Sequence, residues 1–215
     1  MKIIASISEK VHHLNIRKQF YSIFHLEPSL TYLKDFQFLK NLTSFNLYLS
    51  FKLPQPDSTI FLNDLYSHLA LLTNLKNLNL SFDSFKHPSH ILVHLQSLIK
   101  LEQLHLNFAN CFDINNDFLK ALAKILPNFH HLQDFRLILS SKDISPESLM
   151  PLFSAFRQLS SLRTLTLNLY RANINKRSLK ILAHSIAPHL NLTTIDLTLG
   201  RPQKPKSFLQ RFARL

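Results

Sequence analysis

One pattern of apolar residues recurs along most of this 215-residue chain and constrains its fold more than any other feature. Its clearest copy runs from Leu159 to Leu169, where leucines recur first every three residues and then every two. A spacing of three or four is typical of a helix, whereas a spacing of two indicates a strand with alternate side chains buried. Each copy therefore predicts the end of a helix followed by a strand.

Six copies of the pattern predict a repeat array. Equivalent leucines of successive copies, 26 to 33 residues apart, are Leu42, Leu75, Leu101, Leu132, Leu162 and Leu192. Repeats of this length are typical of solenoids, because one such unit cannot bury its apolar residues without its neighbours. Val11, 31 residues before Leu42 and followed by Leu14 and Ile16, indicates a degenerate first copy.

The segments between the predicted strands have helical spacing and helix-start signals. Ser145, Pro146 and Glu147 read as a cap, a first-turn proline and a first-turn acid, and Asn116 and Asp117 mark another start. A helix between two strands returns the chain, so successive strands are expected to be parallel and adjacent. The sequence predicts an α/β solenoid with strands on its concave face and helices on its convex face.

These six copies resemble the leucine-rich repeat family, and most nearly its longer, ribonuclease-inhibitor-like class with full helices. Ile114, Ile144 and Ile174, seven or eight residues beyond the central apolar residue of their strands, add to the resemblance. The resemblance implies a right-handed horseshoe arc. The asparagine that the family places after its LxxLxL core is absent, and its place is taken by Ser50, Asp83, Ala109, Ser140, Tyr170 and Gly200.

The array divides the chain into three expected parts. Residues 1–29 are predicted to form an N-terminal capping unit or a degenerate first repeat, and residues 30–199 the array with its six strand motifs. Residues 200–215 are predicted to form a basic loop and a short helix that caps the last repeat. Two alternatives stay open, namely an organelle transit peptide at the N-terminus and a tail helix that binds a partner or a membrane surface.

Composition narrows the setting of the protein. No apolar run approaches the roughly 20 residues of a transmembrane helix. Cys111 is the only cysteine, so an intrachain disulfide cannot form and an intracellular location, cytoplasmic or nuclear, is expected, with a mitochondrial one as the alternative. We expect no cofactor and no metal, since the twelve histidines show no convergent ligand spacing. Nothing in the sequence indicates a homo-oligomer.

The positive charge is concentrated in the last third of the chain. Residues 148–215 carry a net charge of +10, and the preceding 147 residues a net charge of +2. This imbalance predicts an acidic partner at that end. The residues expected to form the basic docking patch are Arg157, Arg163, Arg171, Lys176, Arg177, Lys180, Arg211 and Arg214.

The polar positions between the buried strand residues predict a second binding surface, on the concave face. Its expected contact residues are Asn46, Tyr48, Asn79, His105, Asn107, Arg136, Thr166, Asn168 and Asp196. Short polar groups on rigid strands are suited to reading an extended partner, although a solvated strand face needs polar residues in any case.

These features favour a non-catalytic interaction module, an adaptor or structural subunit, that docks an acidic protein partner through its basic third. The alternative is a ribonucleoprotein subunit whose basic end contacts RNA phosphates. An enzyme is not expected. Ser81, His105 and Asp134 are expected to lie near one another on neighbouring strands, but almost no glycine is available to build an oxyanion loop beside them.

Overall fold

The computed structural model describes residues 10–20, 39–51, 59–85, 90–111 and 114–199 of the chain. The strands in these residues are β1 (His13–Phe20), β2 (Ser44–Phe51), β3 (Asn77–Asp83), β4 (Gln103–Phe108), β5 (Asp134–Ser140), β6 (Thr164–Tyr170) and β7 (Thr194–Leu199). The helices are α2 (Thr59–Leu69), α3 (Ile91–Leu95), α4 (Asn116–Ile125), α5 (Pro146–Ala155) and α6 (Lys176–Ile186), with single 3-10 turns η4 (Leu126–Asn128) and η5 (Phe156–Gln158).

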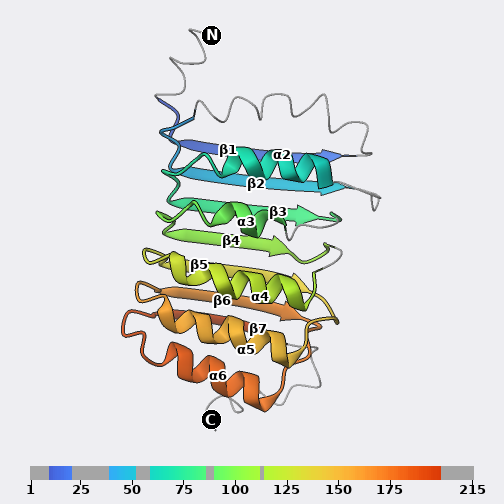
Figure 1. Ribbon diagram of the computed structural model, residues 1–215, viewed down its shortest axis with the longest axis vertical. Coiled ribbons are helices and arrows are strands. Elements are labelled where there is room, and N and C mark those ends of the chain that lie inside the picture. Colours follow the sequence, from blue (N-terminus) through green and yellow to red (C-terminus); the bar gives the residue numbers. More distant parts are fainter. Residues whose placement is uncertain (1–9, 21–38, 52–58, 86–89, 112–113, 200–215) are drawn as a thin grey trace.

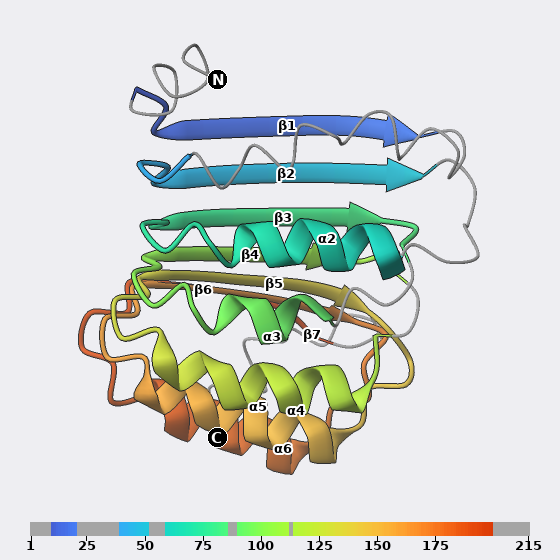
Figure 2. The same ribbon diagram turned by 45° about the horizontal axis from the view of Figure 1, so that its top comes forward.

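All seven strands belong to one sheet, and their order in the sheet is their order in the chain (Figure 1). Every neighbouring pair is parallel. Helices α2 to α6 lie side by side on one face of this sheet (Figure 2). The predicted α/β class and the parallel, adjacent strands are therefore confirmed.

The apolar strand positions align from strand to strand and face the helices. The first position of each strand core is, in register, Leu14, Phe45, Leu78, Leu104, Phe135, Leu165 and Ile195. Phe45, Leu104 and Leu165 are fully buried, as are the leucines that precede the strands from Leu42 to Leu162. Burial of these columns is the main stabilising term of the array, since each repeat covers the apolar residues of the next.

A backbone contact at the start of the strands fixes the step from repeat to repeat. The carbonyl of Thr43 accepts hydrogen bonds from the N–H groups of Lys76 (2.8 Å) and Asn77 (2.9 Å). The carbonyls of His12, Lys76, Glu102, Gln133 and Arg163 accept an equivalent pair from the repeat that follows each. The contact uses main-chain atoms alone, so its recurrence does not depend on the residue type at these positions.

The helix starts differ in detail from the sequence prediction. Asn115, one residue before the predicted start, caps α4, because its side-chain oxygen accepts from the N–H groups of Asp117 and Phe118. Asn175 and Ser178 form a capping box at α6. Ser145 occupies the cap position of α5 as predicted, but its side chain makes no capping hydrogen bond. The amide of Asn116 instead accepts from the Ser145 N–H at 2.8 Å.

The two ends of the sheet are less covered than its middle. At the C-terminal end, Ile195 of β7 is 45% exposed, whereas its register partner Leu165 in β6 is fully buried. At the N-terminal end, Leu14 and Ile16 of the degenerate copy pair with Phe45 and Leu47 and are half-buried. The predicted capping helix in residues 200–215 lies outside the described residues.

Candidate functional site

The face of the sheet opposite the helices, which we call the open face, carries polar side chains in three columns of the strand register. The first column is His13, Ser44, Asn77, Gln103, Asp134, Thr164 and Thr194; the second is Asn15, Asn46, Asn79, His105, Arg136, Thr166 and Asp196; the third is Arg17, Tyr48, Ser81, Asn107, Ile138, Asn168 and Thr198. The nine residues predicted for the concave face all lie in the second and third columns.

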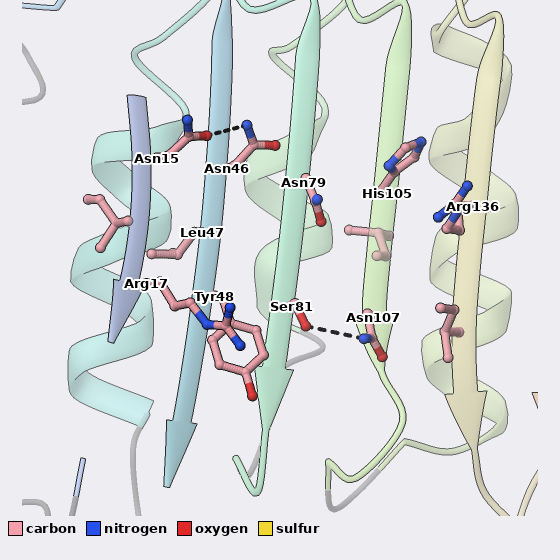
Figure 3. A pocket seen from close by; sticks show the side chains of 13 residues that line it. Asn15, Arg17, Asn46, Leu47, Tyr48, Asn79, Ser81, His105, Asn107 and Arg136 are labelled. Atoms are coloured by element: carbon pink, nitrogen blue, oxygen red, sulfur yellow. Dashed lines mark hydrogen bonds between the residues drawn. The ribbon is translucent and has the colours of Figure 1, made fainter. Parts of the chain in front are cut away.

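A depression of about 450 Å³ lies on the open face and extends from β1 to β5 (Figure 3). Asn15 and Arg17, which the sequence analysis did not select, line it together with seven polar residues of β2 to β5 and four aliphatic residues. The alternation of Leu14 and Ile16 was the signal for them, because the residues beside two buried positions of a strand must face the other way.

Short contacts order the side chains around this depression. Asn46 donates a hydrogen bond to the side-chain oxygen of Asn15. The guanidinium of Arg17 lies over the ring of Tyr48, 4.8 Å from its centroid (Figure 3). Such stacking fixes a long cationic side chain and leaves its charge at the surface.

The three residues of the Ser/His/Asp hypothesis do not form a catalytic relay. His105 Nε2 and Asp134 Oδ2 are 2.9 Å apart, and both side chains are about one-fifth exposed. Ser81 is instead engaged by Asn107, whose Nδ2 donates to Ser81 Oγ at 3.2 Å. A nucleophile needs a base within hydrogen-bond reach, and no hydrogen bond joins Ser81 to His105 among the described residues.

Carboxamides dominate the chemistry that the open face offers. Each asparagine or glutamine presents a donor and an acceptor, so neighbouring amides can pair with the peptide groups of a bound chain. Cations and anions are both present, with Arg17 and Arg136 near the depression and Asp134 and Asp196 beside or beyond it. This surface is therefore suited to forming hydrogen bonds with a polar peptide rather than to binding a partner of one charge.

The predicted basic patch is divided by the fold. Arg157 of η5 and Arg177 and Lys180 of α6 line one depression of about 380 Å³ on the helix side, where Ile181, His184 and Ser185 complete it. Arg163 precedes β6 and Arg171 follows it, at the two opposite ends of that strand, and Lys176 begins α6. Arg211 and Arg214 lie outside the described residues.

The carboxylate of Glu147 interacts electrostatically with Arg177, which lines this depression. The pKa of Glu147 is lowered, chiefly by a hydrogen bond from its own backbone N–H and then by Ser145, with Arg177 contributing attraction. Glu147 is fully exposed in the first turn of α5. An incoming anion therefore meets a depression whose positive charge is only weakly offset.

Cys111 belongs to the core rather than to a site. Burial raises the pKa of its thiol to about 12. The Sγ donates to the backbone oxygen of Phe82 at 3.2 Å. A thiol in this state is a poor nucleophile at neutral pH, because the reactive form is the thiolate.

The described part of the chain lacks the features of two further kinds of site. No group of three or more His, Cys, Asp and Glu side chains there is arranged to hold a metal ion. None of the helices in these same residues combines the length and apolar character that crossing a membrane requires.

Comparison with known proteins identifies no family for this chain. No protein-family model matches the chain, and no curated protein matches it at a significant level.

Proposed function

We propose that this protein is a non-catalytic interaction module of the leucine-rich-repeat type, whose sheet and helices form a right-handed arc with the open face as its concave side. The single parallel sheet in chain order and the recurring strand-start contact support this reading. Curved arrays of this kind use their strand face for binding. An intracellular setting fits the single cysteine, which cannot form an intrachain disulfide.

The open face is the surface on which this module recognises a protein partner. Residues of five strands, β1 to β5, meet around one depression, and the Asn15–Asn46 and Ser81–Asn107 contacts hold their side chains in place. Side chains that are ordered before binding lose less conformational entropy when a partner arrives. A polar partner strand or loop is the ligand class that amides recognise best.

The basic end docks an acidic partner, and one observation carries this part of the proposal. Arg157, Arg177 and Lys180 are separated by up to 23 positions in the sequence, yet they line the same depression. Three cations gathered around one depression, with no acid in its lining, create a positive potential that attracts an anionic partner.

RNA is the alternative partner, and Tyr170 is the observation that favours it. The ring of Tyr170 is 42% exposed at the end of β6, directly before Arg171. An exposed aromatic ring beside an arginine can stack on an unpaired base while the cation contacts a phosphate.

Affinity capture separates the two partners. We expect the tagged full chain to retain protein partners from a cell extract after nuclease treatment, and Arg157→Gln/Arg177→Gln/Lys180→Gln to lose them at physiological salt. Mass spectrometry of the captured proteins provides the measurement. Lys10→Gln/Lys40→Gln/Lys142→Gln removes the same charge from exposed lysines elsewhere and is the matched control.

Two outcomes would change the proposal. Equal capture by the wild-type chain and the triple variant would remove the basic docking role. Capture that disappears with nuclease, together with RNA affinity that falls linearly with salt on logarithmic axes, would replace the protein partner by RNA.

A further inference from the structure

The basic helix surface extends beyond the last third of the chain. A second depression of about 370 Å³ lies between α4 and α5, and Lys120 and Lys124 of α4 line it. These two lysines belong to the residues whose overall charge is close to neutral, so charge counting along the sequence does not associate them with the basic end. In space, α4 is the direct neighbour of α5, and α5 of α6 (Figures 1 and 2).

Helix α5 lies between α4 and α6 and contributes small, uncharged groups to the depression on its α4 side. Pro151 and Ser154 are exposed, whereas Ala155 is 5% exposed. Across from them, Ala123 of α4 is 9% exposed and forms the apolar floor with Ala155. The long cationic side chains therefore stand on the two outer helices and on η5, and the strip between them is small and partly apolar.

Helix stability accounts for Lys124, which lies in the last turn of α4, but not for the cations of α6. Cations stabilise the last turn of a helix, where its dipole is negative, and disfavour the first turn. Lys176 and Arg177 occupy the first turn of α6, which contains no acid. The dipole would favour the opposite charge there, so an external anion is the more direct reason for these residues.

We propose that the two depressions form one docking surface, the three-helix basic surface, for an acidic segment of a protein partner. This inference rests on the proposed function and names the partner's chemistry. The segment crosses α5, with carboxylates near Lys120 and Lys124 at one end and near Arg157, Arg177 and Lys180 at the other. Adjacent helix axes are about 8–10 Å apart, so the two cationic clusters are spanned by roughly six extended residues.

The lining of the surface favours a peptide over a nucleic acid. Among the described residues that line the two depressions, His184 is the one aromatic ring on which a base could stack, and phenylalanine and tyrosine are absent. The floor formed by Ala123, Pro151 and Ala155 instead suits a small apolar side chain between two acidic ones. Asp117 is the nearest competing acid for this end, at 3.1 Å from Lys120 Nζ, and both of these side chains are largely exposed.

Selection from a library of random twelve-residue peptides tests the inference with the full chain. We expect the selected peptides to be rich in Asp and Glu. Lys120→Gln/Lys124→Gln and Arg177→Gln/Lys180→Gln should each weaken their binding by about three- to thirty-fold, as expected for two exposed ion pairs. The charge-matched control Lys10→Gln/Lys40→Gln should bind as tightly as the wild-type chain.

The variants separate this inference from the proposed function. Weaker binding by Arg177→Gln/Lys180→Gln with unchanged binding by Lys120→Gln/Lys124→Gln would overturn the three-helix basic surface and leave the basic docking role intact. Selected peptides without acidic enrichment would overturn both. Preferential binding of a single-stranded RNA competitor at the same lysines would assign the surface to nucleic acid. Circular dichroism of each variant verifies that it is folded.

Discussion

Tyr66 is the residue whose environment departs most from what its chemistry requires. Its ring is fully buried near Phe82 and His94, with centroid separations of 6.2 Å to both. Its hydroxyl has no hydrogen-bond partner among the described residues. Burial, followed by repulsion from Cys111, raises the pKa of Tyr66 well above its ordinary value. The ring contributes packing, whereas the hydroxyl is desolvated without compensation.

We expect Tyr66→Phe to stabilise the protein by about 1 kcal/mol at pH 7, because it removes an unsatisfied buried hydroxyl and keeps the ring. The gain should increase above about pH 10, where tyrosine ionises in the unfolded chain but not in the folded one, so wild-type stability falls as pH rises. Urea unfolding at pH 7 and at pH 10.5 measures both effects. The exposed Tyr170→Phe serves as the control, and a destabilised Tyr66→Phe would show that the hydroxyl is hydrogen-bonded.

At the scale of elements, the side chain of Asn116 links α4 to α5. The sequence pattern predicts this residue only as a start signal of α4. Asn116 follows the α4 cap, and its Oδ1 accepts from the Ser145 N–H (2.8 Å) and from the hydroxyl of Ser148 (2.7 Å). Ser148 is almost completely buried. The start of α5 is thus tied to the preceding repeat, whose amide accepts from the N–H of the cap residue Ser145 rather than from the first N–H groups of the helix.

We expect Asn116→Ala to destabilise the protein by about 1–3 kcal/mol, because it leaves the Ser145 N–H without an acceptor; the Ser148 hydroxyl keeps the Ser145 carbonyl, 2.9 Å away. Asn115→Ala should cost about 1 kcal/mol through the cap of α4 itself. Urea unfolding measures the loss of stability in each variant, and hydrogen exchange shows which part of the chain is affected. Faster exchange at the start of α5 is expected only for Asn116→Ala; the same exchange pattern in both variants would contradict the assignment.

The sequence was a good guide to the strands and a weaker guide to helix starts and surfaces. The period-two leucines predict the open face correctly, since an alternating strand leaves each side chain only two directions. Either of the adjacent residues Asn115 and Asn116 could cap α4. Asn115 does so, because Asn116 bonds to the neighbouring repeat, a contact that the local sequence does not show. Arg157 and Lys180 line the same depression because η5 packs beside α6. This packing cannot be read from the local sequence pattern.

At the scale of the whole molecule, stability is distributed unevenly between the middle and the end of the array. Leu165 in β6 is covered by β5 and β7, whereas Ile195 in β7 has a described neighbour strand on one side only. Leu190, in the turn before β7, is 96% exposed. β1 is also paired on one side only, but its Leu14 is half-buried whereas Ile195 is exposed, so β7 is the part of the described sheet that should open most readily.

We expect Leu165→Ala to cost about 2–5 kcal/mol and Ile195→Ala about 1 kcal/mol, because only the first creates a cavity in a fully packed column. Chemical unfolding of both variants measures the difference. Hydrogen exchange should show the weakest protection in β7 and the strongest in β4 and β5. Equal costs for the two substitutions would indicate that something covers Ile195 in solution.

The identity of strand order and chain order has an evolutionary consequence. A unit of about 30 residues meets only the units before and after it, so duplicating one internal unit would lengthen the protein without rearranging any other pairing. Proteins descended from such a chain could differ in length and still keep the same contacts between neighbouring units. Binding specificity could then change by adding or losing whole coils as well as by single substitutions.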